Sequence, residues 1–376
     1  MSSRRLLSLS TPALGIMAAL WAPVRVTGQA APPSALVNQR AEETLEAARA
    51  ASPHTNEEAL KYFQDDLDDA IANAIQRVWD PTLPREPSPR TPWGAPDLGG
   101  YWLSVNYMPL ERPDELAGKP LYTIEEAIDA FVKGVAGDAA VDPATVHYDW
   151  KEFGMGGWQS QMIPNRRTAM IVDPPDGKIP ALTPEGQARY EDQARGATLE
   201  SRGVFERCIT GNQGPPRIPS IRNFGESQIV QTPDYVVILT QGSSEVRVVP
   251  LDGRPPPSDN IRNWLGASRG YWEGDTLVVE TTNFHEKRKW TRIRGAGSNL
   301  HLVERYTRVD EDLLLYEATL TDPTTWEAPW TIEYPWPKMD PPGLFEFACH
   351  EQNYGLINVL RGARIRAAEY EAELAR

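Results

Sequence analysis

Short runs of alternating apolar and polar residues dominate the second half of the chain. From Gln228 onward they follow one another, separated by turn sequences such as Asp252-Gly253 and Glu273-Gly274-Asp275. Alternation with a period of two is typical of strands that bury one face. The runs are QIVQTP, DYVVILTQ, SEVRVVPLDG, GYWEGDTLVVETTNF, LHLVERYTRVD, LLLYEATLTDP, WTIEYPW and LFEFACHE. Their spacing predicts a mainly β protein with peripheral helices, built on an antiparallel β-barrel or lipocalin-like calyx.

Helical patterns flank and interrupt these strands. Apolar residues recur every three or four positions within residues 36–79, where Pro53 and His54 divide the pattern into two helices. Thr123-Ile124-Glu125-Glu126 has the form of a capping box before a helix that ends near Val135. Thr183-Pro184-Glu185 predicts the start of another helix. A last helix is expected over 360–376.

The composition along the chain predicts five segments. They are a signal peptide over 1–30, a helical N-terminal extension over 31–80, a proline-rich linker over 81–96, a mixed α/β lead-in over 97–227 that packs on the barrel, and the barrel with its C-terminal helix over 228–376. The linker carries six of the 34 prolines, which favours an extended conformation.

The first thirty residues have the features of an export signal. Arg4 and Arg5 precede an apolar run, and small residues lead to an expected cleavage after Ala30. The order Ser3-Arg4-Arg5-Leu6-Leu7 also resembles a twin-arginine signal. Pro12 interrupts the apolar run, and no later segment approaches the roughly 20 apolar residues of a membrane span. We therefore expect a periplasmic or secreted protein without membrane insertion.

Charge and motifs exclude several classes of function. The net charge of −14 argues against nucleic-acid binding, which needs a basic face. The sequence contains no Walker motif, no G-x-S-x-G and no G-x-G-x-x-G in a strand–helix setting, which argues against nucleotide binding and α/β-hydrolase chemistry. It also lacks HExxH and paired CxxC motifs, so we expect no metal site and no cofactor.

Cys208 and Cys349 are the only cysteines in the chain. In an oxidising compartment, a disulfide between them is the expected arrangement. The alternative is a nucleophilic Cys349 activated by the adjacent His350. Neighbouring residues of a strand point to opposite faces, which places that pair badly for base activation. The sequence favours the disulfide.

Several phrases of the sequence resemble a large group of exported bacterial proteins that are usually described only as hypothetical. The phrases are RTAMIVDPPDGKIPALTPEGQARY, VVPLDGRPPP, GYWEGDTLVVETTNF, LHLVERYTRVD, DPTTWEAPWT and ACHEQNYG. The resemblance covers roughly residues 92–362. It implies an exported, mostly β protein, but it supplies no reaction, cofactor or catalytic residue.

Strand parity sorts the polar residues of these phrases by face. In LHLVERY, His301 and Arg305 share one face, whereas Glu304 and Tyr306 share the other. A His301–Glu304 metal chelate is therefore not expected on a regular strand. Charged residues in the middle of a strand lie either on the solvent-exposed face of a half-buried sheet or around the mouth of a barrel. The sequence leaves both interpretations open.

The second interpretation yields a set of candidate site residues. The proposed catalytic groups are His301, Glu304, His350 and Glu351, because a histidine beside a carboxylate suits proton transfer. The proposed substrate-binding residues are Arg247, Glu280, Asn283, Arg305, Asn353 and Tyr354.

Three functions remain in competition. The preferred one is an enzyme that acts on a small organic molecule, such as a glycoside, an aromatic compound or a terpenoid, by cofactor-independent acid–base chemistry as a lyase, isomerase or hydrolase. The second is a non-catalytic ligand-binding protein of lipocalin-like form. The third is a structural module that dimerises through residues 36–79.

Overall fold

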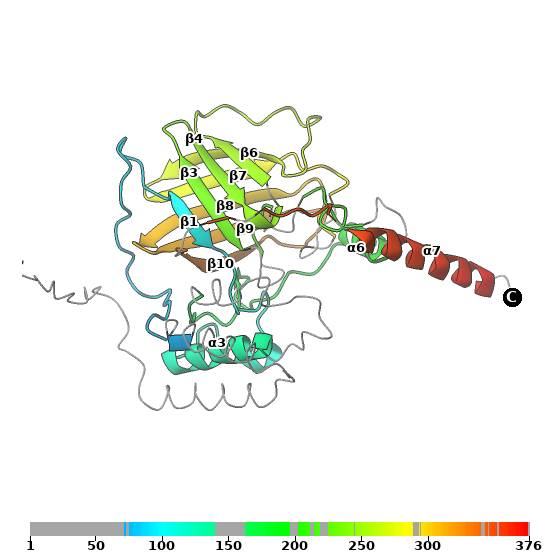
Figure 1. Cartoon of the computed structure of the whole chain (residues 1–376), viewed down its shortest axis with the longest axis horizontal. Helices are drawn as coiled ribbons and strands as arrows, with labels where there is room; N and C mark the ends of the chain where they lie inside the picture. Colours follow the sequence, from blue (N-terminus) through cyan, green and yellow to red (C-terminus); the bar gives the residue numbers. More distant parts are fainter. Residues whose placement is uncertain are drawn as a thin grey trace, which may run out of the picture.

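Two antiparallel β-sheets form the body of the protein in the computed structural model (Figure 1). The structure describes residues 71–72, 75–139, 162–195, 202–210, 214–218, 225–243, 245–288, 293, 295–339, 343–344, 346–351 and 353–374. The predicted signal peptide and most of the predicted helical extension lie outside the described residues.

The smaller sheet has four strands in the order β1-β3-β4-β5. Its strands are β1 (Gly100–Leu103), β3 (Glu226–Gln231), β4 (Tyr235–Thr240) and β5 (Glu245–Pro250). The larger sheet has six strands in the order β2-β10-β9-β8-β7-β6. Its strands are β2 (Ile171–Asp173), β6 (Ala267–Glu273), β7 (Thr276–Thr282), β8 (His301–Asp310), β9 (Leu313–Thr321) and β10 (Trp330–Pro337). The alternating runs from Gln228 to Trp336 thus form the predicted strands, and the lead-in adds β1 and β2.

The predicted closed barrel is wrong, because neither sheet closes on itself. On one side, the described residues of the two sheets are joined by an isolated bridge between Trp102 and Lys338, beside a 2.9 Å hydrogen bond from the Met339 amide to the Tyr101 carbonyl. On the other side β5 and β6 form no ladder. Large aromatic side chains, among them Trp102 and Trp336, fill the space between the sheets and let them pack face to face.

Inward-facing side chains of alternate positions build the core. On β9 these are Leu314, Tyr316, Ala318 and Leu320, which are all fully buried. Their outward neighbours, Glu317 and Thr319, are half-buried. The parity expected from the sequence is confirmed here.

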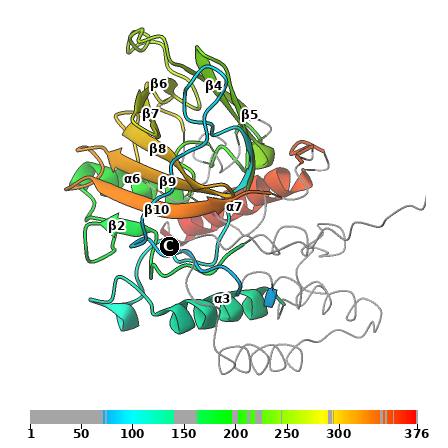
Figure 2. The same ribbon diagram turned by 90° about the vertical axis from the view of Figure 1, so that its left-hand side faces the viewer.

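Helix α3 (Ile124–Ala139) lies beneath the sheets (Figure 2). The predicted capping box is present: the Glu126 amide donates to Thr123 Oγ1 at 3.2 Å, and the Thr123 amide donates to the Glu126 carboxylate at 2.8 Å. The inner face of the helix, which includes Phe131 and Val135, packs on Leu103 in a second apolar cluster.

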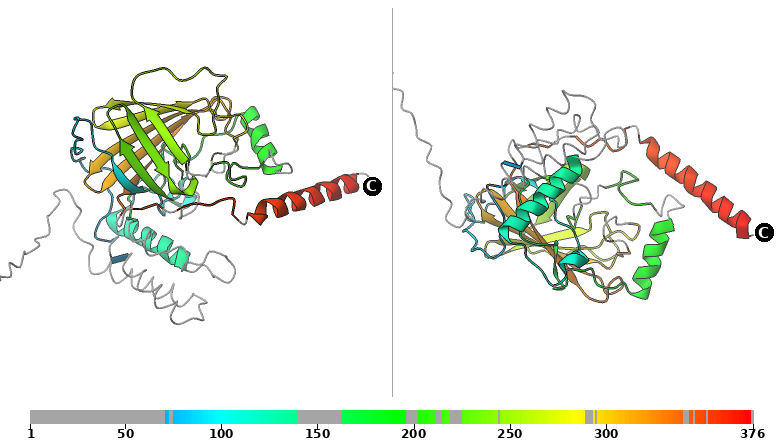
Figure 3. Two further views of the ribbon diagram at one scale, coloured as in Figure 1. Left: turned by 45° about the horizontal axis from the view of Figure 1, so that its top comes forward. Right: turned by 90° about the horizontal axis from the view of Figure 1, so that it is seen from below.

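Two further helices lie to one side of the sheets. Helix α6 (Pro184–Arg195) begins with the predicted cap, since the Gly186 amide donates to Thr183 Oγ1 at 3.0 Å. Helix α7 (Tyr354–Leu374) begins six residues before its predicted start and extends away from the sheets (Figures 1 and 3). No helix among the described residues combines the length and apolar character that crossing a membrane requires.

The expected strand at LFEFACHE is wrong. Residues 346–351 form an irregular segment that ends in a turn. Its side chains have local partners instead of a sheet: Phe347 stacks on Phe205, with ring centroids 6.1 Å apart. The predicted disulfide is confirmed, and Cys208 and Cys349 lie 5.6 Å apart between their Cα atoms.

Candidate functional site

Two of the predicted site residues meet between the sheets. Arg247 of β5 forms a buried ion pair with Glu304 of β8. The hydroxyl groups of Tyr306 and Tyr316 donate to the other carboxylate oxygen of Glu304 at 3.0 and 2.9 Å. Thr281 Oγ1 accepts from the guanidinium of Arg247 at 2.7 Å.

A second arginine extends this polar core. The Arg217 amide donates to the Tyr316 hydroxyl at 2.8 Å, and the Tyr334 hydroxyl donates to the Arg217 carbonyl at 2.8 Å. The Arg217 guanidinium donates to the Gly225 carbonyl at 2.9 Å and lies over the Trp336 ring. Because these contacts join the two sheets and the loop between them, the buried network holds the layers together.

Burial sets the ionisation of the network. Burial and the Glu304 carboxylate raise the pKa of both Tyr306 and Tyr316 well above its ordinary value, so both phenols stay protonated. Burial alone would lower the pKa of the Arg247 guanidinium, but Glu304 raises it above its ordinary value. With every carboxylate oxygen bonded and Glu304 fully buried, we assign Glu304 and Arg247 a structural role.

His301, Glu280 and Arg305 lie on the opposite, outer face of the large sheet. His301 Nε2 is 3.4 Å from Glu280 Oε2, and the two side chains are 44% and 43% exposed. Arg305 pairs with Glu273 of β6. As parity predicted, His301 and Glu304 do not meet.

The other predicted residues have local structural contacts. Asn283 adopts a positive φ of 57° and donates to the Pro257 and Ser258 carbonyls at 3.0 and 3.1 Å, which orders the loop before β6. His350 and Glu351 are exposed in the turn after Cys349. The Asn353 side chain donates to Cys208 Sγ at 3.2 Å. Tyr354 is exposed at the start of α7.

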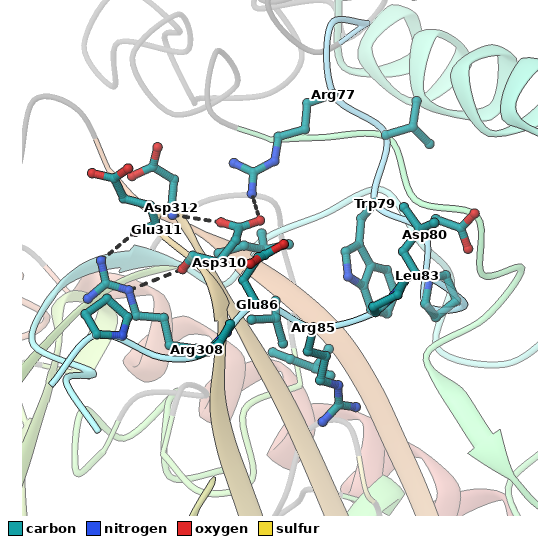
Figure 4. A pocket seen from close by; sticks show the side chains of 18 of the residues that line it. Arg77, Trp79, Asp80, Leu83, Arg85, Glu86, Arg308, Asp310, Glu311 and Asp312 are labelled. Carbon is teal, nitrogen blue, oxygen red and sulfur yellow. Dashed lines mark hydrogen bonds and ion pairs between the residues drawn. The ribbon is translucent and has the colours of Figure 1, made fainter. Parts of the chain in front are cut away.

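A cleft of about 770 Å³ opens on the outer face of the large sheet, under the proline-rich segment (Figure 4). One wall is residues 77–89, which we call the strap. The other wall is the end of the β8–β9 hairpin, with the turn residues 310–312 and parts of β9 and β10. In Figure 4 the strap residues Trp79 and Leu83 lie across from Asp310 and Asp312.

Specific contacts fix the strap against the sheet. The Glu86 amide donates to the Val309 carbonyl at 2.9 Å, and the Ser88 hydroxyl donates to the Arg308 carbonyl at 2.8 Å. Arg77 forms an ion pair with Asp310 at one end. Trp79 packs against Leu313 and Leu315 in a third apolar cluster. The segment expected to be only a linker is therefore a wall of the cleft.

Two carboxyl side chains lie opposite each other beside this cleft. Glu317 of β9 and Glu333 of β10 are direct partners in the antiparallel register, and Glu333 lines the cleft. Directly paired residues have Cβ atoms roughly 4.5–5.5 Å apart. Arg305 is the partner of Glu317 on its other side and approaches the Glu317 carboxylate at 3.8 Å. The row across three strands is thus Arg305, Glu317, Glu333.

The two carboxyl groups have different environments. Arg167 donates to Oε1 of Glu333 from both Nε and Nη2, the former at 2.8 Å, and no other described donor binds this carboxylate. Burial raises the pKa of Glu317, and the negative charge of Glu333 raises it further; Arg305 and Arg85 oppose the shift. Two neighbouring carboxyls with different surroundings are suited to opposite roles in proton transfer.

The sequence did not single out Glu317 or Glu333. Each was visible as a lone acid between apolar neighbours, in LYEAT and in TIEYP. Their pairing depends on the register between β9 and β10, which alternation alone does not give.

Comparison of the chain with protein-family models, curated proteins and solved structures finds no match. The resemblance to exported bacterial proteins therefore stays an expectation. The function has to be inferred from the fold and from the contacts of the site.

Proposed function

We propose that the protein is an exported enzyme that acts on a small polyhydroxylated molecule in the cleft, with Glu317 and Glu333 as its proton-handling groups. The observation that supports the proposal is the direct pairing of Glu317 with Glu333, of which Glu333 lines the cleft. The Cys208–Cys349 disulfide supports an oxidising location outside the cytoplasm.

The two carboxyls suit the hydrolysis of a C–O bond. Glu317, whose raised pKa favours the protonated form, gives its proton to the departing oxygen. Glu333 takes a proton from the water that adds to the carbon left behind, and Arg167 keeps this carboxylate in place. One bond to oxygen breaks and another forms, and proton exchange with solvent restores both groups. Glycosides are the substrate class in which paired carboxyls commonly act in this way.

The lining of the cleft supports a neutral, hydroxyl-rich substrate. Its volume lies within the range of small-molecule sites. Seven acidic side chains and three arginines line it, so carboxylate oxygens are available to accept hydrogen bonds from hydroxyl groups. This excess of acids disfavours an anionic ligand. Trp79 is only 8% exposed and offers little ring surface for an aromatic substrate.

The structure gives less support to the second hypothesis, a non-catalytic ligand carrier of lipocalin-like form. Such a carrier needs a hollow between the sheets, and that space holds Trp102, Tyr306, Trp336 and the Arg247–Glu304 pair. The module that dimerises through residues 36–79 falls mostly outside the described residues.

The test is a turnover assay on a panel of neutral aryl glycosides. Glu317→Gln and Glu333→Gln should each lower kcat by about 100-fold or more, the usual contribution of a general acid or base. Glu317→Gln should abolish the alkaline limb of the pH profile, because that limb reports loss of the acid's proton. Glu333→Gln should retain the alkaline limb, because Glu317 is still present.

Glu327→Gln serves as the matched control, since Glu327 is exposed in the loop before β10 and does not line the cleft. It should retain wild-type turnover. Full turnover in Glu317→Gln and Glu333→Gln, or a panel that neither reacts with nor thermally stabilises the protein, would overturn the proposal.

A further inference from the structure

A row of register partners runs across the large sheet from the carboxyl pair. Glu333 of β10 pairs with Glu317 of β9, which pairs with Arg305 of β8. Arg305 pairs with Val278 of β7, and Val278 pairs with Tyr271 of β6, the edge strand of the sheet. Tyr271 therefore lies three strands from Glu317, roughly 14 Å away at the usual spacing of strands. The row connects the wall of the cleft to the far edge of the sheet.

Tyr271 presents a fixed aromatic surface at the end of this row. Its hydroxyl donates to Oε1 of Glu280 at 3.1 Å. Glu280 is the register partner of Arg269, which lies two residues before Tyr271 on β6. The tyrosine side chain therefore leans across β7, along the face of the sheet. With 43% of its surface exposed, Tyr271 is open to contact with a ligand.

The acidic groups around Tyr271 lie beside basic ones. Arg305 forms an ion pair with Glu273, and His301 Nε2 lies 3.4 Å from Glu280. These four side chains are between 34% and 46% exposed. Guanidinium, imidazole and carboxylate groups each offer more hydrogen-bonding positions than one partner uses. This part of the sheet therefore suits a neutral ligand with many hydroxyl groups better than an ionic one.

The combination fits a chain of sugars. An aromatic ring offers a rigid apolar surface for the C–H face of a sugar, and the polar groups beside it offer hydrogen bonds to the hydroxyl groups. A monosaccharide bound at the carboxyl pair is too short to reach Tyr271, whereas an oligosaccharide reaches it.

We propose that the substrate is a neutral oligosaccharide, which extends from Glu317 and Glu333 along the outer face of the large sheet and stacks a distal sugar on Tyr271. This inference rests on the proposed hydrolysis of glycosides. It adds the length of the substrate and a residue that selects for that length.

The test measures the binding of oligosaccharides to Glu317→Gln, which should leave the substrate uncleaved. The probes are cello-, xylo-, manno- and malto-oligosaccharides, from the disaccharide to the hexasaccharide, in isothermal titration calorimetry. In at least one series the affinity should increase by about tenfold with chain length, because the longer chains gain the contact with Tyr271. Addition of Tyr271→Ala should remove this increase, so that every chain length binds like the disaccharide.

Turnover separates binding from chemistry. In the otherwise wild-type protein, Tyr271→Ala should raise KM for the longest chains and leave kcat the same, because the ring binds the substrate and the transition state equally. Tyr271→Phe keeps the ring and loses only the bond to Glu280, so it should retain most of the length dependence. Tyr235→Ala is the matched control, since Tyr235 lies at the start of β4 on the outer face of the other sheet. It should leave the length dependence intact.

Two kinds of failure can be told apart. Equal affinity for all chain lengths, or a length dependence that Tyr271→Ala retains, would overturn the inference, whereas turnover of aryl monoglycosides would still support the proposed function. A protein that neither cleaves nor binds any of these sugars would overturn both.

Discussion

Charged residues in the strands of this protein have two different roles, and their position in the alternating pattern does not show which role each one has. Glu304 and Glu317 both lie in the middle of strands with alternating patterns. Glu304 faces the core, where Arg247 and two tyrosines bind both of its oxygens. Glu317 faces outward, next to a second acid and only 33% exposed. The first arrangement is a closed structural network, and the second leaves a carboxyl able to exchange a proton.

Removal of one partner of the buried ion pair should lower the free energy of unfolding strongly, whereas removal of both partners should lower it much less. Arg247→Met or Glu304→Leu alone leaves an uncompensated buried charge and should lower the free energy of unfolding by about 3–5 kcal/mol. The double variant should lose much less than the sum of the two. Denaturant unfolding of the four proteins gives the coupling directly. Additive losses would show that the pair does not act as a unit.

The alternation of apolar and polar residues predicted that β3 to β10 are strands, because each of these strands buries one face. The same alternation wrongly predicted a strand at LFEFACHE, where the apolar residues pack locally near the disulfide. Closure of the barrel was also wrong, since it depends on hydrogen bonds between edge strands. Three prolines at 255–257 lie in the connection from β5 to β6, and this segment forms no ladder. The strap was predicted as extended, but its packing depends on distant residues such as Val309.

Two glycines within helices should respond oppositely to alanine. A Cβ at Gly186 in α6 would lie 2.4 Å from the Thr325 carbonyl oxygen, a backbone atom that cannot easily move. Gly186→Ala should therefore cost about 1–3 kcal/mol of stability. A Cβ at Gly362 in α7 would meet no atom within 4 Å.

Gly362→Ala should stabilise α7 by about 0.5–1 kcal/mol, because alanine has the higher helix propensity. Denaturant unfolding checks the first variant and helical circular dichroism the second. A Gly186→Ala variant as stable as the wild type would contradict the close packing of α6 on Thr325.

At the scale of the whole molecule, a few long-range contacts connect segments that are distant in sequence. The buried arginines join the two sheets, the strap joins the N-terminal part to the β8–β9 hairpin, and the disulfide joins the base of α7 to residue 208. Such contacts link positions as far as 233 residues apart, as the ion pair between Arg77 and Asp310 shows. Local patterns predict the elements, but not which of them meet.

Removal of the disulfide should test how much one such contact contributes. Cys208→Ser/Cys349→Ser should lose about 3–5 kcal/mol of unfolding free energy, because the bond closes a long loop in the unfolded chain. Denaturant unfolding of this variant is compared with that of the oxidised protein. The reduced wild type should match the double variant. A loss below about 1 kcal/mol would mean that the disulfide only anchors α7.

The proposed site depends most on the interaction between Glu317 and Glu333. The direct measurement is a carbon-13 NMR titration of the Glu317 carboxyl in the wild type, in Glu333→Gln and in the Glu327→Gln control. We expect the pKa of Glu317 to lie above the ordinary value of a glutamate, because the group is partly buried beside a like charge. It should fall in Glu333→Gln and stay unchanged in Glu327→Gln. An ordinary pKa in the wild type, or no change on loss of Glu333, would contradict the proposed site.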